Sequence, residues 1–251
     1  DTPRPRGGVY SASECIRPLI DKLGVLHPCK ARDGRLCPPC ARRSAEQVRN
    51  TIADGLELSD AYGSAIVTLT NAPSGSKVSA KDVLEWNENA SRMRVNNVET
   101  VKRFTERAGL VYEGMAWVAE TQRTGAVHFH MLPRISAPEG ITLPGEVWGL
   151  FWDSLQAHLL KRPTHVRMGK GVRLVSRTHV RMIVAPMVDA MRVGNYLKKS
   201  LVHPASNVSF SRVSAVRHLL GERLGSRARS LLGYRGRLWG HSRGWLAVSP
   251  P

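Results

Sequence analysis

Residues 117–130 read Trp-Val-Ala-Glu-Thr-Gln-Arg-Thr-Gly-Ala-Val-His-Phe-His. Successive side chains of a strand point to opposite faces of a sheet, so His128 and His130 should share one face. Residues 121–125 are polar, end in glycine and suit a hairpin loop. A turn centred in this loop places Glu120 opposite His128 on the neighbouring strand. The stretch therefore predicts a β-hairpin that brings one carboxylate and two imidazoles together on one face.

Glu120, His128 and His130 form a mixed oxygen and nitrogen ligand set for a divalent cation. Such a set leaves coordination positions open for water or for a phosphate oxygen. Mn²⁺ or Mg²⁺ fits, and the two imidazoles favour Mn²⁺. The alternative is a pair of ordinary half-buried histidines in a strand, and the matching register of Glu120 weighs against it. We therefore expect a metal site at this hairpin.

The composition favours a partner that carries many negative charges. The chain has 251 residues, 42% of them hydrophobic, and a formal net charge of +17. This length suffices for one large domain with appendages, and the excess of positive charge favours nucleic acid as the partner. No apolar run reaches the roughly 18 residues of a membrane span, and the polar start lacks a signal-peptide pattern. We expect a cytoplasmic protein without a membrane partner.

The four cysteines all lie near the start of the sequence. In a reducing compartment they are more typical of metal ligands or plain thiols than of disulfides. The spacing Cys37-Pro-Pro-Cys40 aims two thiolates at one ion. Cys29, together with Cys15 or His27, would complete a tetrahedral zinc site. Zn²⁺ would then hold together a region rich in proline and glycine that has no core of its own, whereas the alternative is a loose segment with free thiols.

Hydrophobic periodicity and capping signals divide the rest of the chain into helices and strands. Asn96 and Asn97 form a weak point, so the helix predicted over residues 80–108 could also be two helices. Residues 133–138 read as a loop. The other predicted helices cover residues 42–58, 144–162, 186–201 and 211–232, and the predicted strands cover residues 65–70 and 112–120, a pair within 165–184 and a short edge strand within 236–245.

Basic and apolar residues alternate between residues 165 and 184. Strands with this pattern present their basic side chains on one face, which can follow the phosphates of a nucleic acid. The alternative is an ordinary solvated face, and the net charge of +17 favours the first interpretation. The candidate DNA-binding residues are Arg123, Arg167, Lys170, Arg173, Arg177 and Lys198.

Three motifs, taken in order, resemble those of the HUH endonucleases, and specifically the rolling-circle replication initiators of plasmids, phages and small single-stranded DNA viruses. The first is a strand with hydroxyl-bearing residues, here Ile-Val-Thr-Leu-Thr at residues 66–70. The second is His-hydrophobic-His, here His-Phe-His at residues 128–130, with an upstream acidic residue that Glu120 matches. The third is Tyr-x-x-Lys on a helix, here Tyr196 and Lys199, which share one helical face.

The resemblance covers residues 60 to 245, and Gly-Arg-Leu-Trp-Gly at residues 236–240 is similar to the C-terminal end of phage-type members. It implies an α+β fold with a central antiparallel sheet of about five strands and flanking helices, related to the RNA-recognition motif. We divide the chain accordingly. Residues 1–58 are a basic, cysteine-rich N-terminal segment with a candidate zinc site, and residues 59–246 are the HUH endonuclease domain.

The activity implied by the resemblance is metal-dependent, site-specific nicking and joining of DNA at a replication origin. Tyr196 would attack a phosphodiester of single-stranded DNA or of an origin hairpin, leaving a 5′-phosphotyrosine and a free 3′-OH that primes rolling-circle replication. Lys199, or its neighbour Lys198, would assist. The sequence has no Walker A motif, so a host helicase and polymerase would act in trans. A plasmid or phage protein in a bacterial cytoplasm is the setting that this implies.

Two rival interpretations remain. A conjugative relaxase or a single-tyrosine transposase would use the same chemistry, but relaxases usually place the tyrosine before the histidine motif and such transposases usually lack a long N-terminal segment. A non-enzymatic, zinc-stapled nucleic-acid-binding protein would explain the charge and the cysteines. It would leave the agreement among the metal-ligand triad, Tyr196 and Lys199 as coincidence.

Overall fold

The structure is a computed structural model of the whole chain. It describes residues 15, 19–20, 22–23, 26–27, 29, 37–71, 79–122, 124–163, 165–168, 172–183, 186–202, 234 and 237–246. Within these ranges it describes only the backbone of residues 27, 38, 71, 165–168, 172–175, 186–188 and 198–202. The helix predicted over residues 211–232 lies outside the described residues.

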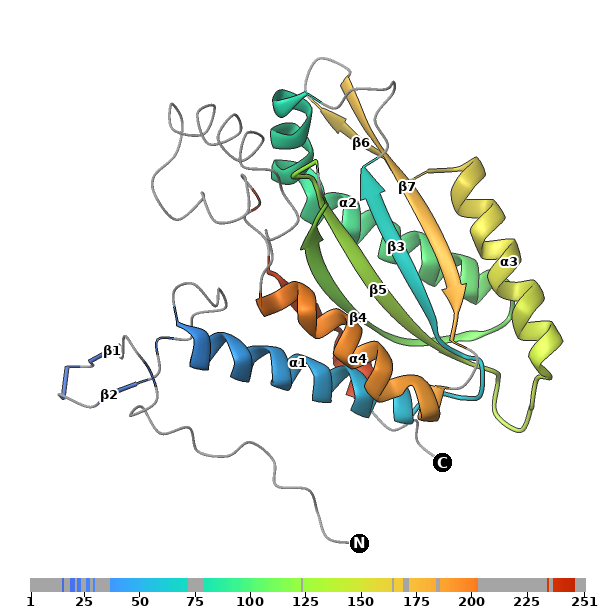
Figure 1. Cartoon of the computed structure of the whole chain (residues 1–251). Coiled ribbons are helices and arrows are strands. Elements are labelled where there is room, and N and C mark those ends of the chain that lie inside the picture. Colours follow the sequence, from blue (N-terminus) through green and yellow to red (C-terminus); the bar gives the residue numbers. More distant parts are fainter. Residues whose placement is uncertain are drawn as a thin grey trace, which may run out of the picture.

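An antiparallel sheet forms the centre of the described structure (Figure 1). Its strand order is β6-β7-β3-β5-β4-β8, and each neighbouring pair is antiparallel. The predicted α+β class is therefore confirmed, with the three-residue β8 added at one edge. The strands are β3 (Ala65–Asn71), β4 (Val111–Thr121), β5 (Val127–Ser136), β6 (His165–Met168), β7 (Val172–Met182) and β8 (Trp239–His241).

Helices cover both faces of this sheet (Figure 1). The helices α2 (Ala80–Arg107) and α3 (Gly145–Lys161) pack on one face, where they bury a core that includes Phe129. The helices α1 (Pro38–Glu57) and α4 (Pro186–Val202) pack on the other face, where they share a second core with Val118 of β4. Side chains of β4 and β5 therefore contribute alternately to two cores. None of the described helices combines the length and the apolarity that a membrane span requires.

Local interactions explain where α1 begins and why α2 is a single helix. Helix α1 begins four residues before position 42, because Cys37 is its N-cap and the prolines that follow occupy first-turn positions that need no backbone donor. Helix α2 is continuous through the predicted weak point. Asn97 is fully buried there, and its side-chain amide donates a hydrogen bond to the hydroxyl of Thr178 on β7 at 3.1 Å.

The prediction of a loop over residues 133–138 is wrong, because β5 continues to Ser136. Arg134 lies within this part of the strand and is 1% exposed. Its guanidinium pairs with the carboxylate of Glu113 at 2.7 Å and donates a hydrogen bond to the carbonyl of Gly244 at 2.8 Å. Glu113 is the extra residue of a register shift in β4, and such a bulge re-aims a side chain. The buried ion pair between Arg134 and Glu113 thus stabilises β5 at the residues where the sequence predicts a loop.

Helix α1 belongs to the predicted N-terminal segment, yet it packs against α4 and contributes to the core that they share with the sheet. Before it, β1 (Leu19–Ile20) and β2 (Leu26–His27) form a separate antiparallel pair. The division of the chain at residue 58 stays a prediction.

We expect Arg134→Met to lower the free energy of unfolding by about 3 to 5 kcal/mol, because it removes the guanidinium from a largely buried carboxylate. Urea denaturation followed by tryptophan fluorescence measures the change. The double variant Glu113→Gln, Arg134→Met should lose less than the single variant, since no charge is then left in the bulge. A loss below about 1 kcal/mol in the single variant would mean that the pair behaves like an exposed one.

Candidate active site

The predicted register of the β4–β5 hairpin is confirmed, with Glu120 directly opposite His128. The Nε2 atoms of His128 and His130 lie 3.1 Å and 3.2 Å from the same oxygen, Oε2 of Glu120. Two ligand atoms about 2.1 Å from a shared ion lie about 3.0 to 3.4 Å apart at coordination angles of roughly 90° to 109°. These three side chains, the metal-ligand triad, therefore have a spacing at which they could hold a metal ion.

The triad is largely shielded from solvent. The exposed fractions of the side chains are 16% for His128, 5% for His130 and 19% for Glu120. Burial lowers the pKa of His130, while its hydrogen bond to Glu120 opposes that shift. A neutral imidazole is favoured, and only this form has the free nitrogen lone pair that a metal ligand needs.

Thr68 orients one of the imidazoles. It lies on β3 directly opposite His130, and its hydroxyl oxygen is 3.2 Å from Nδ1 of that ring. A partner on the second ring nitrogen fixes the orientation of a metal-binding histidine, here with Nε2 toward Glu120. The sequence analysis included Thr68 in a strand with hydroxyl-bearing residues but predicted no role for its side chain.

Asn87 of α2 holds the hairpin loop from the opposite face of the sheet. Its side-chain amide donates to the carbonyl of Gly125 at 3.0 Å and its side-chain oxygen accepts from the N–H of Val127 at 2.8 Å. Gly125 has a φ of +88°, a conformation that favours glycine. The sequence analysis missed Asn87. The sequence signal that could have identified Asn87 is a polar residue on the apolar side of a long helix. In the structure its side chain is 1% exposed.

Tyr196 on α4 lies beside the triad. Its ring centroid is 5.6 Å from that of His130, with the two planes at 71°. The side chain is 52% exposed, whereas the next residue, Leu197, is fully buried in the core shared with α1. The side chain of Leu197 therefore anchors the helix in the core, while the phenol of Tyr196 lies at the surface beside the ring of His130.

A groove of about 550 Å³ opens between α4 and the strands β3 and β7. His130 and Tyr196 line one part of it, and the rest is lined by both apolar and basic side chains. Because Thr68 pairs with His179 in the β3–β7 register, the exposed side chains at 177, 179 and 181 of β7 share the face of the triad. The basic lining residues are His179 and Arg181 of β7 and Arg192 of α4, with Asp189 beside them.

The sequence analysis missed these lining residues, although the alternation Arg177-x-His179-x-Arg181 carries their signal. Among the predicted DNA-binding residues, Arg177 is exposed on β7 near the groove. Residues 167 and 173 pair in the β6–β7 hairpin, and residues 198 and 199 belong to α4, all described by backbone alone. Arg123 and Lys170 lie outside the described residues.

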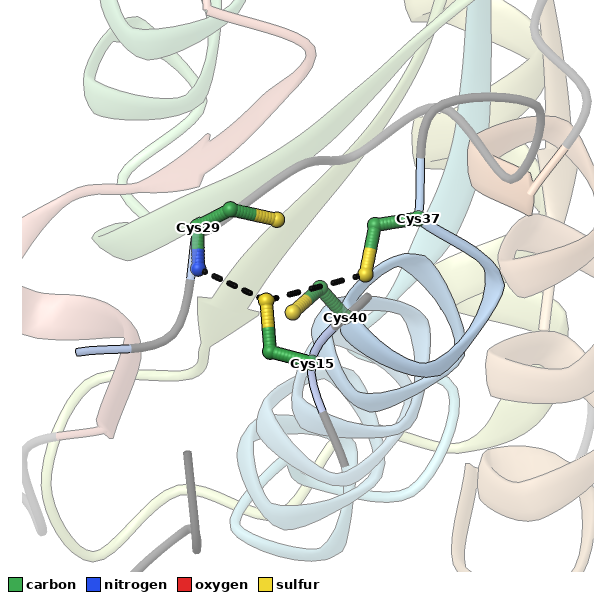
Figure 2. A group of neighbouring side chains, drawn as sticks. All are labelled: Cys15, Cys29, Cys37 and Cys40. Carbon is green, nitrogen blue, oxygen red and sulfur yellow. Dashed lines mark hydrogen bonds between the residues drawn. The ribbon is translucent and has the colours of Figure 1, made fainter. Parts of the chain in front are cut away.

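The four cysteines form a second group that could hold a metal ion. The Sγ atoms of Cys15, Cys29, Cys37 and Cys40 all lie within 4.8 Å of one another (Figure 2). Burial, with the neighbouring thiols adding to it, raises the pKa of Cys40 to about 12. In the absence of an ion, this thiol is therefore protonated at neutral pH. Binding of a metal to the cysteines would release protons.

We expect Thr68→Val to weaken Mn²⁺ binding at the triad by about 10- to 100-fold, because His130 loses the partner that orients its ring. Titration of Mn²⁺ followed by electron paramagnetic resonance gives the affinity. Thr70→Val is the matched control, since Thr70 lies on the same strand and donates to the carbonyl of Arg177 instead. Equal affinities in the two variants would exclude this role for Thr68.

Comparisons with protein-family models, with curated proteins and with solved structures gave no match. What the protein does must therefore be inferred from its own side chains and their arrangement.

Proposed function

We propose that the protein is a metal-dependent endonuclease of the HUH type that nicks and rejoins single-stranded DNA, as rolling-circle replication initiators do. The observation that carries this proposal is the contact between Tyr196 and His130. It places a half-exposed phenol beside a metal-ligand triad, at the edge of a groove that His179, Arg181 and Arg192 help to line. A nucleophile, a site for phosphate charge and a path for a polyanion thus lie together.

The ligand set favours Mn²⁺ or Mg²⁺, with Mn²⁺ preferred because two of the three ligands are imidazoles. A cation bound there would withdraw charge from the scissile phosphate and from the departing oxygen. Glu120 and His128 hold their positions through the strand register, and Thr68 holds His130. The protein therefore presents the three ligands already arranged, and little reorganisation is needed when the ion binds.

Tyr196 supplies the nucleophile. Its phenolic oxygen attacks the phosphorus and forms a phosphotyrosine bond, while the proton passes to solvent. The bond from phosphorus to the 3′-oxygen breaks, and that oxygen takes up a proton to become a 3′-OH. The reverse attack by a 3′-OH restores the phosphodiester, so that joining needs no nucleotide. Lys199, one helical turn from Tyr196, is proposed to stabilise the phenolate or to contact the phosphate.

The proposed substrate is single-stranded DNA or the exposed strand of an origin hairpin. Arg181, His179 and Arg192 would contact the phosphates on either side of the reacting one. Arg177 and the basic β6–β7 hairpin would extend this path. We assign duplex opening and synthesis to a host helicase and polymerase, and we place the reaction in a bacterial cytoplasm, with a plasmid or phage as the source of the origin.

We expect wild-type protein with Mn²⁺ to form a covalent adduct with single-stranded DNA that Tyr196→Phe does not form. A random-sequence oligonucleotide pool, with different fluorophores on its 5′ and 3′ ends, is incubated with the protein and separated on a denaturing gel. A 5′-phosphotyrosine retains the 3′ label, because the downstream fragment stays on the protein. Sequencing of the retained strands then gives the preferred site.

The controls separate the competing interpretations. Tyr62→Phe removes a phenol hydroxyl on the side of α3 and should leave the adduct intact, whereas a chelator should abolish it. An adduct that persists in Tyr196→Phe would identify a different nucleophile. Tight DNA binding without any adduct would support the non-enzymatic nucleic-acid-binding protein instead.

We expect Arg181→Ala to weaken binding of single-stranded DNA and to reduce the slope of log affinity against log salt by about 0.7, the value for one lost phosphate contact. Fluorescence anisotropy over a salt series measures both quantities. Arg107→Ala is the matched control, because Arg107 is an exposed arginine on α2, across the sheet from the groove. Equal slopes in both variants would place the DNA elsewhere.

A further inference from the structure

Helix α4, which carries Tyr196, depends on α1 for its position. Among the described elements, α4 contacts α1 more extensively than any other. The two backbones approach so closely that a Cβ added at Gly194 would lie 2.9 Å from the carbonyl oxygen of Arg49. Val48 of α1 and Leu197 of α4 belong to the same buried core. A displacement of α1 would therefore displace the phenol relative to the metal-ligand triad.

The C-terminal half of α1 is held by Trp245, which is fully buried. Its indole N–H donates to the carbonyl of Thr51 at 2.9 Å, and its ring lies where a Cβ on Gly55 would clash. The N-terminal end of α1 lies beside the C-terminal end of α4 in Figure 1, so it flanks the half of α4 that follows Tyr196. What fixes this end of α1 bears directly on the nucleophile.

Cysteines alone form the buried cluster at that end, among the residues that the structure describes. Cys37 is the N-cap of α1, and Cys40 lies in its first turn. The preceding strand pair β1–β2 supplies no apolar core, since the side chains of Leu19, Ile20 and Leu26 are half exposed or more. A segment of this kind is held by a metal or a disulfide when it has no hydrophobic core of its own.

We propose that Cys15, Cys29, Cys37 and Cys40 bind one Zn²⁺ ion, and that this ion fixes the N-terminal end of α1 and through it the position of α4. The second half of the proposal rests on the proposed role of Tyr196, whereas the zinc site stands without it. Figure 2 shows that the sulfur atoms of the two cysteines from the preceding segment and of the two from the start of α1 lie close together.

The geometry fits a tetrahedral thiolate site. Sulfur ligands about 2.3 Å from a zinc ion lie about 3.8 Å apart, and Sγ of Cys15 is 3.9 Å from Sγ of Cys37. The N–H of Cys29 donates to Sγ of Cys15 at 3.2 Å, a bond that favours the charged form of a sulfur ligand. The helix start adds positive partial charge beside Cys37 and Cys40. Four sulfurs without an oxygen ligand favour zinc over the hard cation expected at the triad.

Metal analysis of the full-length protein by mass spectrometry tests the site itself. We expect one zinc per chain in the wild type, in a triad variant such as His128→Ala, and in His27→Ala, which removes the other candidate ligand. Cys37→Ser, Cys40→Ser should lose the zinc. Cobalt-substituted protein should show the visible absorption of tetrahedral thiolate coordination. Four titratable thiols or two disulfides without zinc, or iron in its place, would overturn the assignment.

Hydrogen exchange of wild-type protein, before and after zinc removal by a chelator and after zinc is restored, tests the coupling to α4. This avoids variants that fail to fold. We expect faster exchange in α1 and α4 without zinc, unchanged exchange in β3 and β5, and recovery on re-addition. Unchanged protection of α4 would overturn the coupling. At saturating Mn²⁺, zinc removal should also slow adduct formation at least tenfold with little change in Mn²⁺ affinity.

The hydrogen-exchange measurement and the adduct measurement distinguish the zinc proposal from the proposed nicking activity. Zinc-dependent protection of α4 in a protein that never forms a DNA adduct would support the zinc site and its coupling while removing the nicking activity. An adduct that forms at the same rate with and without zinc would retain the nicking activity and overturn the positioning role.

Discussion

The register between β4 and β5 is the constraint on which the candidate site depends. A slip of one residue would turn every side chain of one strand to the other face and send Glu120 away from the histidines. Asn87 prevents this by binding both sides of the loop, at Gly125 and Val127. The hydrogen bonds that arrange the face of the triad are thus made by a helix on the opposite face of the sheet.

Two cores of different character support the two parts of the site. The core under α2 and α3 is rich in large aromatic side chains, including Trp86, Trp148 and Trp152, and it fixes the sheet. The core under α1 and α4 is built largely of alanine, valine and leucine, so that these helices lie close to the sheet and to each other. The metal-ligand triad is therefore carried by the sheet that the first core supports, whereas Tyr196 is carried by a helix of the second core. This difference is why the attachments of α1 bear on the position of the proposed nucleophile.

Sequence periodicity was sufficient to predict the four helices that contact the sheet, because these follow from the spacing of apolar residues. It was also sufficient to predict the hairpin register and the triad, because these follow from the period of two in a strand. It failed over residues 133–138, where proline and arginine suggest a loop but Arg134 is neutralised by Glu113 in a bulge. It also missed Asn87 and Arg181. Their roles depend on which strand or loop lies opposite them, and no local pattern carries that information. The sequence predicted the cluster of four sulfur atoms only in part, because spacing alone did not decide whether Cys15 or His27 would be the fourth ligand.

The three-residue strand β8 has a consequence for how the sheet meets its surroundings. It pairs with residues 116–118 of β4, and the carbonyl of Leu238 accepts a further hydrogen bond from Ala119. At the opposite edge, β6 has only four residues. An exposed edge strand is a template on which another chain can add, and very short outer strands remove that template. Because β8 occupies the free side of the strand that carries Glu120, a second polypeptide could pair there only by displacing it. β8 thereby keeps a second polypeptide from pairing with the part of β4 that it covers, next to Glu120.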